Sequence, residues 1–132
     1  MFLGAAVLVA LLFFGFIALA MGLSDSAPQE TSSTLDVTLN EFSIGGQLTA
    51  PAGDVNLRLK NDGNAVHNIV ARDLALGSGD IGPGGSGELA LGNLAAGSYQ
   101  IFCNIAGHEA SGMVTDLVIT AGVYAWSGFE VT

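Results

Sequence analysis

Three side chains that can bind a metal ion lie at equal intervals within one short stretch of the sequence. Cys103, His108 and Met113 are spaced five residues apart, and a glycine directly precedes both His108 and Met113, which eases a turn. His67 lies far upstream and is the only other histidine of the chain. Both histidines and the only cysteine therefore belong to one candidate site.

This set of donors favours a particular metal. A thiolate, two imidazoles and a weak thioether form a trigonal site with one long axial bond, which is a copper geometry. Because that geometry is a compromise between the preferences of Cu(I) and Cu(II), little has to move when an electron arrives or leaves. Structural zinc prefers a closed set of cysteines and histidines, and methionine is a poor zinc ligand. We therefore expect one copper ion bound by His67, Cys103, His108 and Met113.

Each of the four residues also has an ordinary structural explanation. A lone cysteine often behaves as a small buried hydrophobe, and a histidine or a methionine can serve as a core residue. A thiol enzyme is a further alternative, in which His67 or His108 would activate Cys103. The sequence indicates no third catalytic member and no substrate cleft, and two histidines are too few for a second, catalytic copper. Taken together, the residues favour a metal site in a protein that is not an enzyme and has no small-molecule substrate.

Short strands must position these side chains. Apolar and polar residues alternate with a period of two at 35–39 and 55–60, which is typical of half-buried strands. Phe42 and Ile44 change the parity, which predicts a bulge or bend. Further strands are expected at residues 67–71, 88–91, 98–103 and 114–120. Seven or eight strands with turns between them predict an all-β domain, a Greek-key sandwich or barrel.

The amino-terminal segment differs from the rest of the chain. Residues 2–23 carry no charge and are long enough, as a helix, to cross a hydrocarbon layer of ~30 Å. We expect one transmembrane anchor at 1–23, a flexible linker at 24–34 and the folded domain at 35–132. A secretory signal is the alternative, because Ala18-Leu19-Ala20 resembles a cleavage site. Either interpretation places the domain on the extracytoplasmic face, periplasmic or outer.

The balance of charge limits the class of partner. Twelve acidic residues and three basic ones give a formal charge of −9, so nucleic acid is a poor partner because phosphate binding needs clustered Lys and Arg. An acidic surface can instead steer encounters with a basic face of another protein, or it is simply a solvated surface. A single cysteine also excludes an internal disulfide.

Two segments of the sequence resemble the cupredoxins. Residues 101–113 read IFCNIAGHEASGM and residues 66–70 read VHNIV, and both are similar to the plastocyanin-like and halocyanin-like electron carriers. The resemblance extends from residue 35 to about 120. It implies a mononuclear type 1 (blue) copper centre that transfers one electron at a time. A copper-storage or copper-delivery protein with the same ligands is the alternative.

The resemblance also assigns roles beside the metal. It implies that Asn68 ties the two ligand loops together by hydrogen bonds, and that His108 lies near the surface as the electron port. Backbone amides near Asn68 and Asn104 are candidates to donate a hydrogen bond to the sulfur of Cys103. Ala106 departs from the family pattern, in which many members have proline. The implied partners are a redox donor and acceptor, such as a cytochrome or a respiratory or photosynthetic complex.

Overall fold

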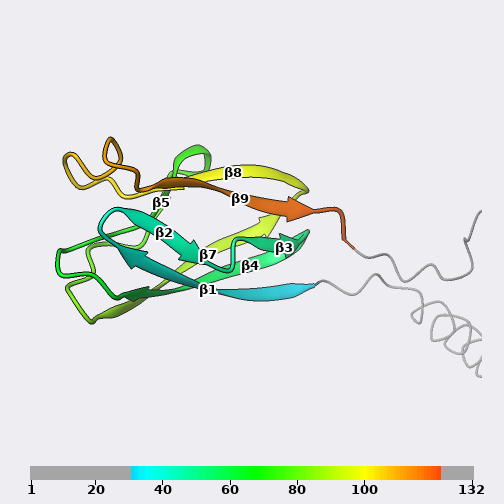
Figure 1. Ribbon diagram of the computed structural model, residues 1–132. Helices are drawn as coiled ribbons and strands as arrows, with labels where there is room; N and C mark the ends of the chain where they lie inside the picture. The colour runs from blue at the N-terminus through cyan, green and yellow to red at the C-terminus, as the bar shows by residue number, and fades with distance from the viewer. Residues whose placement is uncertain (1–30, 123–132) are drawn as a thin grey trace, which may run out of the picture.

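A computed structural model describes residues 31–122, which form two β-sheets packed face to face (Figure 1). The first sheet has the strand order β2-β1-β4-β7 and the second has the order β3-β9-β8-β5-β6. The strands are β1 (Ser32–Asn40), β2 (Ser43–Gly46), β3 (Thr49–Pro51), β4 (Gly53–Asn61), β5 (Val70–Ala71), β6 (Leu76–Gly77), β7 (Ser86–Leu94), β8 (Gly97–Phe102) and β9 (Val114–Thr120). A 3-10 turn, η2 (Arg72–Leu74), lies between β5 and β6. The described part of the chain is therefore an all-β sandwich, as the sequence predicted.

The core lies between the sheets because apolar residues recur at every second position of the central strands. In β4, Val55, Leu57 and Leu59 are fully buried, while their neighbours along the strand are more exposed. In the facing sheet, Ile101 of β8 and Leu117 of β9 are also fully buried. Successive side chains of a strand point to opposite faces, so this pattern places one apolar face of each sheet inside.

The pairing of strands brings the predicted ligand loop to one end of the sandwich. Strands β8 and β9 are antiparallel, with Phe102 opposite Val114. Cys103 directly follows β8 and Met113 directly precedes β9, so both lie where the two strands join the same loop. Strand β1 runs parallel to β4, and β4 runs antiparallel to β7.

The number and limits of the strands differ in part from the sequence prediction. Nine strands are present in residues 31–122, because short pairings such as β3 and β6 are too brief to leave a periodic pattern. The expected strand at 67–71 is limited to Val70–Ala71. The first strand begins at Ser32 rather than after residue 34, because Ser32–Thr34 pair with Asp54–Asn56 of β4.

The parity change at Phe42, for which a bulge or bend was expected, comes from a hairpin turn. Glu41 and Phe42 form the turn of an antiparallel hairpin in which Asn40 of β1 lies opposite Ser43 of β2. A reversal of chain direction resets which face each side chain occupies, and it therefore gives the same change of pattern as a bulge. This turn lies at the same end of the sandwich as the metal-ligand candidates, as the contacts below show.

The expected transmembrane helix at 1–23 and most of the expected linker lie outside the described residues. Between residues 31 and 122, no helix combines the length and the apolar character needed to cross a membrane.

Candidate metal centre

His67 is fixed by a loop that joins β4 to the second sheet. Its backbone pairs with Ile81 in an isolated bridge, with N···O distances of 3.1 and 2.7 Å. The loop is shaped from inside by buried Asn61, whose Nδ2 donates to the carbonyl oxygens of Ala65 and Ile81, each at 2.8 Å. The Oδ1 atom of Asn61 accepts from the amide of Gly63 at 2.9 Å. The His67 side chain is consequently held with no solvent exposure.

The other three candidates share the loop between β8 and β9. The amide of Cys103 donates to the carbonyl of Met113 at 3.1 Å, and the amide of Met113 donates to the carbonyl of His108 at 3.1 Å. Gly107 has a φ of 82°, a left-handed conformation that glycine adopts without strain. The loop therefore turns tightly enough to place His108 and Met113 next to Cys103 in space.

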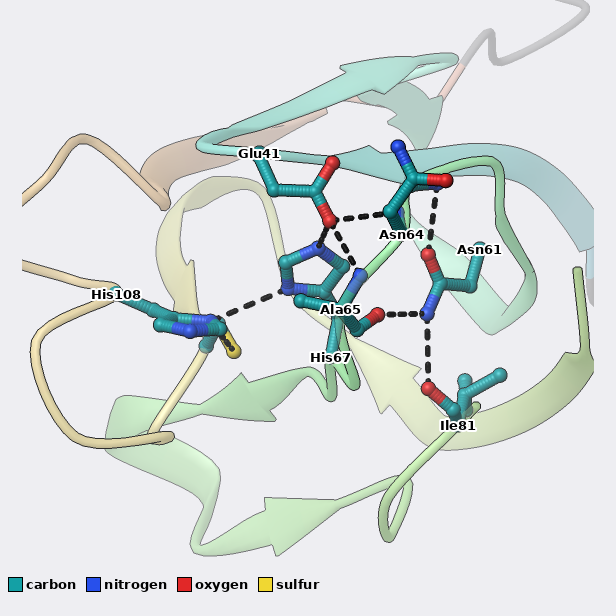
Figure 2. A network of polar contacts seen from close by, with 9 residues as sticks. Glu41, Asn61, Asn64, Ala65, His67, Ile81 and His108 are labelled. Atoms are coloured by element: carbon teal, nitrogen blue, oxygen red, sulfur yellow. Dashed lines mark hydrogen bonds and ion pairs between the residues drawn. The ribbon is translucent and has the colours of Figure 1, made fainter. Parts of the chain in front are cut away.

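Three of the predicted ligands present their donor atoms at one point. The Nδ1 atoms of His67 and His108 are 3.2 Å apart (Figure 2), and the Sγ of Cys103 is 3.6 Å from Nδ1 of His108. The ligand atoms of His67, Cys103 and His108 all lie within 4.8 Å of one another. Met113 is fully buried and is joined through its backbone to both Cys103 and His108.

These separations suit a shared metal ion. Nitrogen and sulfur ligands bind a first-row ion at about 2.0 and 2.3 Å, so two such ligands of one ion are separated by about 3 to 4 Å. The cluster of one cysteine sulfur and two imidazoles, with fully buried Met113 at the end of the same loop, fits one type 1 copper. Two of the donors come from fully buried residues, His67 and Cys103, and His108 is only partly buried.

Asn68 links the two ligand loops, as the resemblance implied. Its Nδ2 donates to Oδ1 of Asn104 at 2.6 Å and to Oδ1 of Asp80 at 2.9 Å. Its Oδ1 accepts from the backbone amide of Asn104 at 2.9 Å. The amide of Asn104 is thus engaged with Asn68, although it was a candidate donor to the sulfur of Cys103. Asn104 therefore acts next to the centre mainly by tying the Cys103 end of its loop to the His67 loop.

Loss of the Asn68 side chain should loosen this connection. We expect Asn68→Ala to lower the free energy of unfolding by about 1–3 kcal/mol, because it removes three hydrogen bonds made by a buried side chain. Asn104→Ala is the matched variant, since it removes a contact with Asn68 but keeps the bond from the Asn104 amide. Chemical denaturation should show the larger loss for Asn68→Ala, and equal losses would contradict the assigned role of that amide bond.

One further residue at the site, Glu41, was not predicted from the sequence. Its Oε1 lies 3.1 Å from Nε2 of His67, the ring nitrogen opposite the one that faces the other ligands (Figure 2). The same oxygen accepts from the amides of Asn64 and Ala65 at 2.7 and 2.6 Å. The Ala65 amide bond is the largest cause that holds the pKa of Glu41 below its ordinary value. Glu41 lies 26 residues from His67 along the chain, so only the fold reveals the contact.

Comparison with known proteins identifies the class. The family described as "Cupredoxin-like domain" matches residues 9–115. The structure is similar to auracyanin A, a "blue" copper protein from Chloroflexus aurantiacus, with a TM-score of 0.58, 18% identity, and coverage of 68% of this chain and 100% of that chain. It is also similar to dithionite-reduced auracyanin from Roseiflexus castenholzii, with a TM-score of 0.57, 21% identity, and coverage of 68% and 99%.

A further similar structure belongs to a larger assembly. A chain of a heme-copper terminal oxidase dimer gives a TM-score of 0.53 at 19% identity, with coverage of 89% of this chain and 95% of that chain. Comparison with curated protein sequences found no match. The structural likenesses show the fold, and the family match covers most of the sequence. The chain belongs to the cupredoxin-like family, and its cofactor is one type 1 copper.

Proposed function

We propose that this protein transfers single electrons through a mononuclear type 1 copper centre held by His67, Cys103, His108 and Met113. The observation that supports this most directly is the convergence of one thiol sulfur and two imidazole nitrogens within 4.8 Å. When bound there, copper supplies a one-electron redox couple. The protein holds the donors through bonds that need no metal, such as those of Asn68 and Asn61, so the site is prepared before binding.

The surface beside His108 supports its role as the electron port. His108 is partly exposed, and the edge of its ring meets Phe42 with the centroids 5.1 Å apart. Phe42 is one of the exposed large apolar side chains, at 42%, and Val66, the residue before His67, is another, at 41%. A small apolar surface around an imidazole suits a transient contact with a redox protein, because weak electron-transfer encounters use little area.

The partners are proposed to be a redox protein that donates and another that accepts. The acidic excess of the chain would favour a partner with a basic face. We further propose that residues 1–23 anchor the protein in a membrane, that 24–31 form a linker, and that the domain lies on the extracytoplasmic side. The uncharged run at 2–23 supports this arrangement.

The copper-bound form should be intensely blue. The full-length chain, loaded with one equivalent of Cu(II), is expected to show strong visible absorption from sulfur-to-copper charge transfer. A reductant should bleach the blue colour, and removal of one electron per copper by an oxidant should restore it. Absorption spectroscopy combined with a coulometric titration measures both properties.

A copper-storage or copper-delivery protein would behave differently. It would bind copper without the intense colour, and it would release the ion to a competing chelator rather than cycle between oxidation states. Tight, colourless copper binding would therefore favour the delivery function and reject the electron-transfer function. Failure to bind copper at all would reject both.

A further inference from the structure

We propose that Glu41 is a positioning residue of the metal centre, whose carboxylate fixes the orientation of the His67 ring and stabilises the oxidised state by its negative charge. The inference rests on the proposed function and deepens it. It concerns the turn between β1 and β2, which contains no metal-ligand candidate.

The two nitrogens of His67 face different partners. Nδ1 points toward the other ligands, 3.2 Å from Nδ1 of His108, whereas Nε2 lies 3.1 Å from the Glu41 carboxylate (Figure 2). A carboxylate can only accept a hydrogen bond, so the proton of the neutral ring must be on Nε2. The lone pair is then on Nδ1, where a metal needs it. Glu41 thus selects the one tautomer of His67 that can bind copper on the inner side.

The carboxylate is itself held in place. One oxygen accepts from His67 and from the amides of Asn64 and Ala65, which belong to the loop that carries His67. Hydrogen bonds donated to a carboxylate favour its ionised form, and the two amides of this loop both donate to Glu41. The side chain is only 30% exposed and the His67 side chain is fully buried. The contact is therefore better shielded from water than an ordinary surface pair.

The charge of Glu41 is not offset by a basic side chain. Within the described residues, its only ion-pair partner is His67. Glu109, the residue after His108, instead pairs with Arg72, which also lies over the ring of Phe102. A negative charge beside a ligand imidazole makes it a stronger donor and attracts the ion with the higher charge more strongly. Of the two, Glu41 should therefore be the carboxylate that favours Cu(II) over Cu(I).

The neighbouring residues leave room for this arrangement. A Cβ added at Gly63 would lie 2.5 and 2.6 Å from the two Glu41 carboxylate oxygens, too close for real atoms. Gly63 does not have a positive φ, so alanine there should displace the carboxylate without imposing backbone strain of its own. Phe42, next to Glu41, contacts the ring of His108. The same turn therefore touches both imidazoles, one through charge and one through packing.

Three variants of the full-length chain test the proposal. Glu41→Gln removes the charge and keeps an acceptor oxygen, and Gly63→Ala keeps the charge but displaces it. Glu88→Gln is the control, because it removes one negative charge from an exposed position on β7. Circular dichroism establishes that each variant is folded. Redox titration and competition for Cu(II) then give the potential and the affinity.

We expect Glu41→Gln to raise the reduction potential and to weaken Cu(II) binding about 10- to 100-fold, the range found when the hydrogen-bond partners of metal ligands are lost. Gly63→Ala should change both quantities in the same direction, and Glu88→Gln should leave both close to the wild-type values. Equal potentials and affinities in Glu41→Gln and Glu88→Gln would overturn the proposal, even in a chain that is blue.

A measurement on the metal-free chain separates this proposal from the proposed function. Long-range proton–nitrogen NMR should show His67 of the wild-type chain protonated at Nε2 and unprotonated at Nδ1. The opposite tautomer would overturn the role of Glu41 whatever the colour of the copper form. Conversely, a wild-type chain with the expected tautomer but no blue copper complex would overturn the electron-transfer function and leave the Glu41–His67 contact standing.

Discussion

Cys103→Ser should abolish the blue absorption completely while the chain still folds. The colour of a type 1 centre comes from charge transfer between a thiolate sulfur and copper, and the chain contains no other cysteine. A serine oxygen occupies nearly the same space but is a harder and far weaker donor to this ion. Visible absorption spectra of copper-loaded wild-type and variant chains, recorded at equal protein concentration, measure the effect.

The control for Cys103→Ser must separate loss of the ligand from loss of the fold. Cys103 is fully buried, and its amide bonds to Met113, a contact that serine can keep. Thermal unfolding of the metal-free variant should therefore remain cooperative. The copper content of the variant, measured by elemental analysis, distinguishes a colourless bound ion from an empty site. Blue absorption that survives in the variant would refute the ligand assignment.

The sequence predicts the strands whose one face is buried, because burial imposes the period-two pattern. Residues 55–60 lie within β4, and residues 114–120 coincide with β9. The pattern carries no information on which strand pairs with which, so the parallel pairing of β1 with β4 was not predicted. It also cannot detect a two-residue strand such as β6, in which both residues are exposed.

The site shows the same division between local and distant information. His67, Cys103, His108 and Met113 could be selected by residue type, because few side chains are soft metal donors and three of them share one loop. Glu41 could not be selected in this way, since acidic residues are common on a protein surface and usually indicate only solvation. Its significance comes from a turn that folding brings against the His67 loop.

For the same reason, the role of Asn68 at the site could be predicted and the role of Asn61 could not. The resemblance to the cupredoxins implied that Asn68 joins the loops, but it did not imply that Asn61 holds the His67 loop from within the core. Asparagine is common in the turns that end strands, so its residue type alone does not indicate a role for Asn61 at the site. In the structure it is fully buried and makes hydrogen bonds to Gly63, Ala65 and Ile81. The side chain of Asn61 therefore both stabilises the turn after β4 and holds the His67 loop in place.

Met113→Leu should keep the blue colour and raise the reduction potential. The variant retains the three main donors, Cys103, His67 and His108, so the thiolate that would give the colour is unchanged. The thioether that Met113 would offer as a weak donor is lost, and the potential of type 1 centres depends on that ligand and on the apolar character of the surroundings. We expect a rise on the order of 60 mV, which corresponds to a tenfold change in the equilibrium constant for one electron. Spectroelectrochemical titration of wild-type and variant chains measures it.

Packing must be excluded as the cause of that shift. Leu and Met have similar volumes, and exchanges between them usually cost less than about 1.5 kcal/mol, so Met113→Leu should remain folded although Met113 is fully buried. Leu117→Met is the matched control. Leu117 is a fully buried residue of β9, and this substitution replaces leucine by methionine, the reverse of Met113→Leu. Its potential should equal that of the wild type. If both variants shifted the potential equally, repacking of the core would explain the change, and Met113 would not be an axial donor.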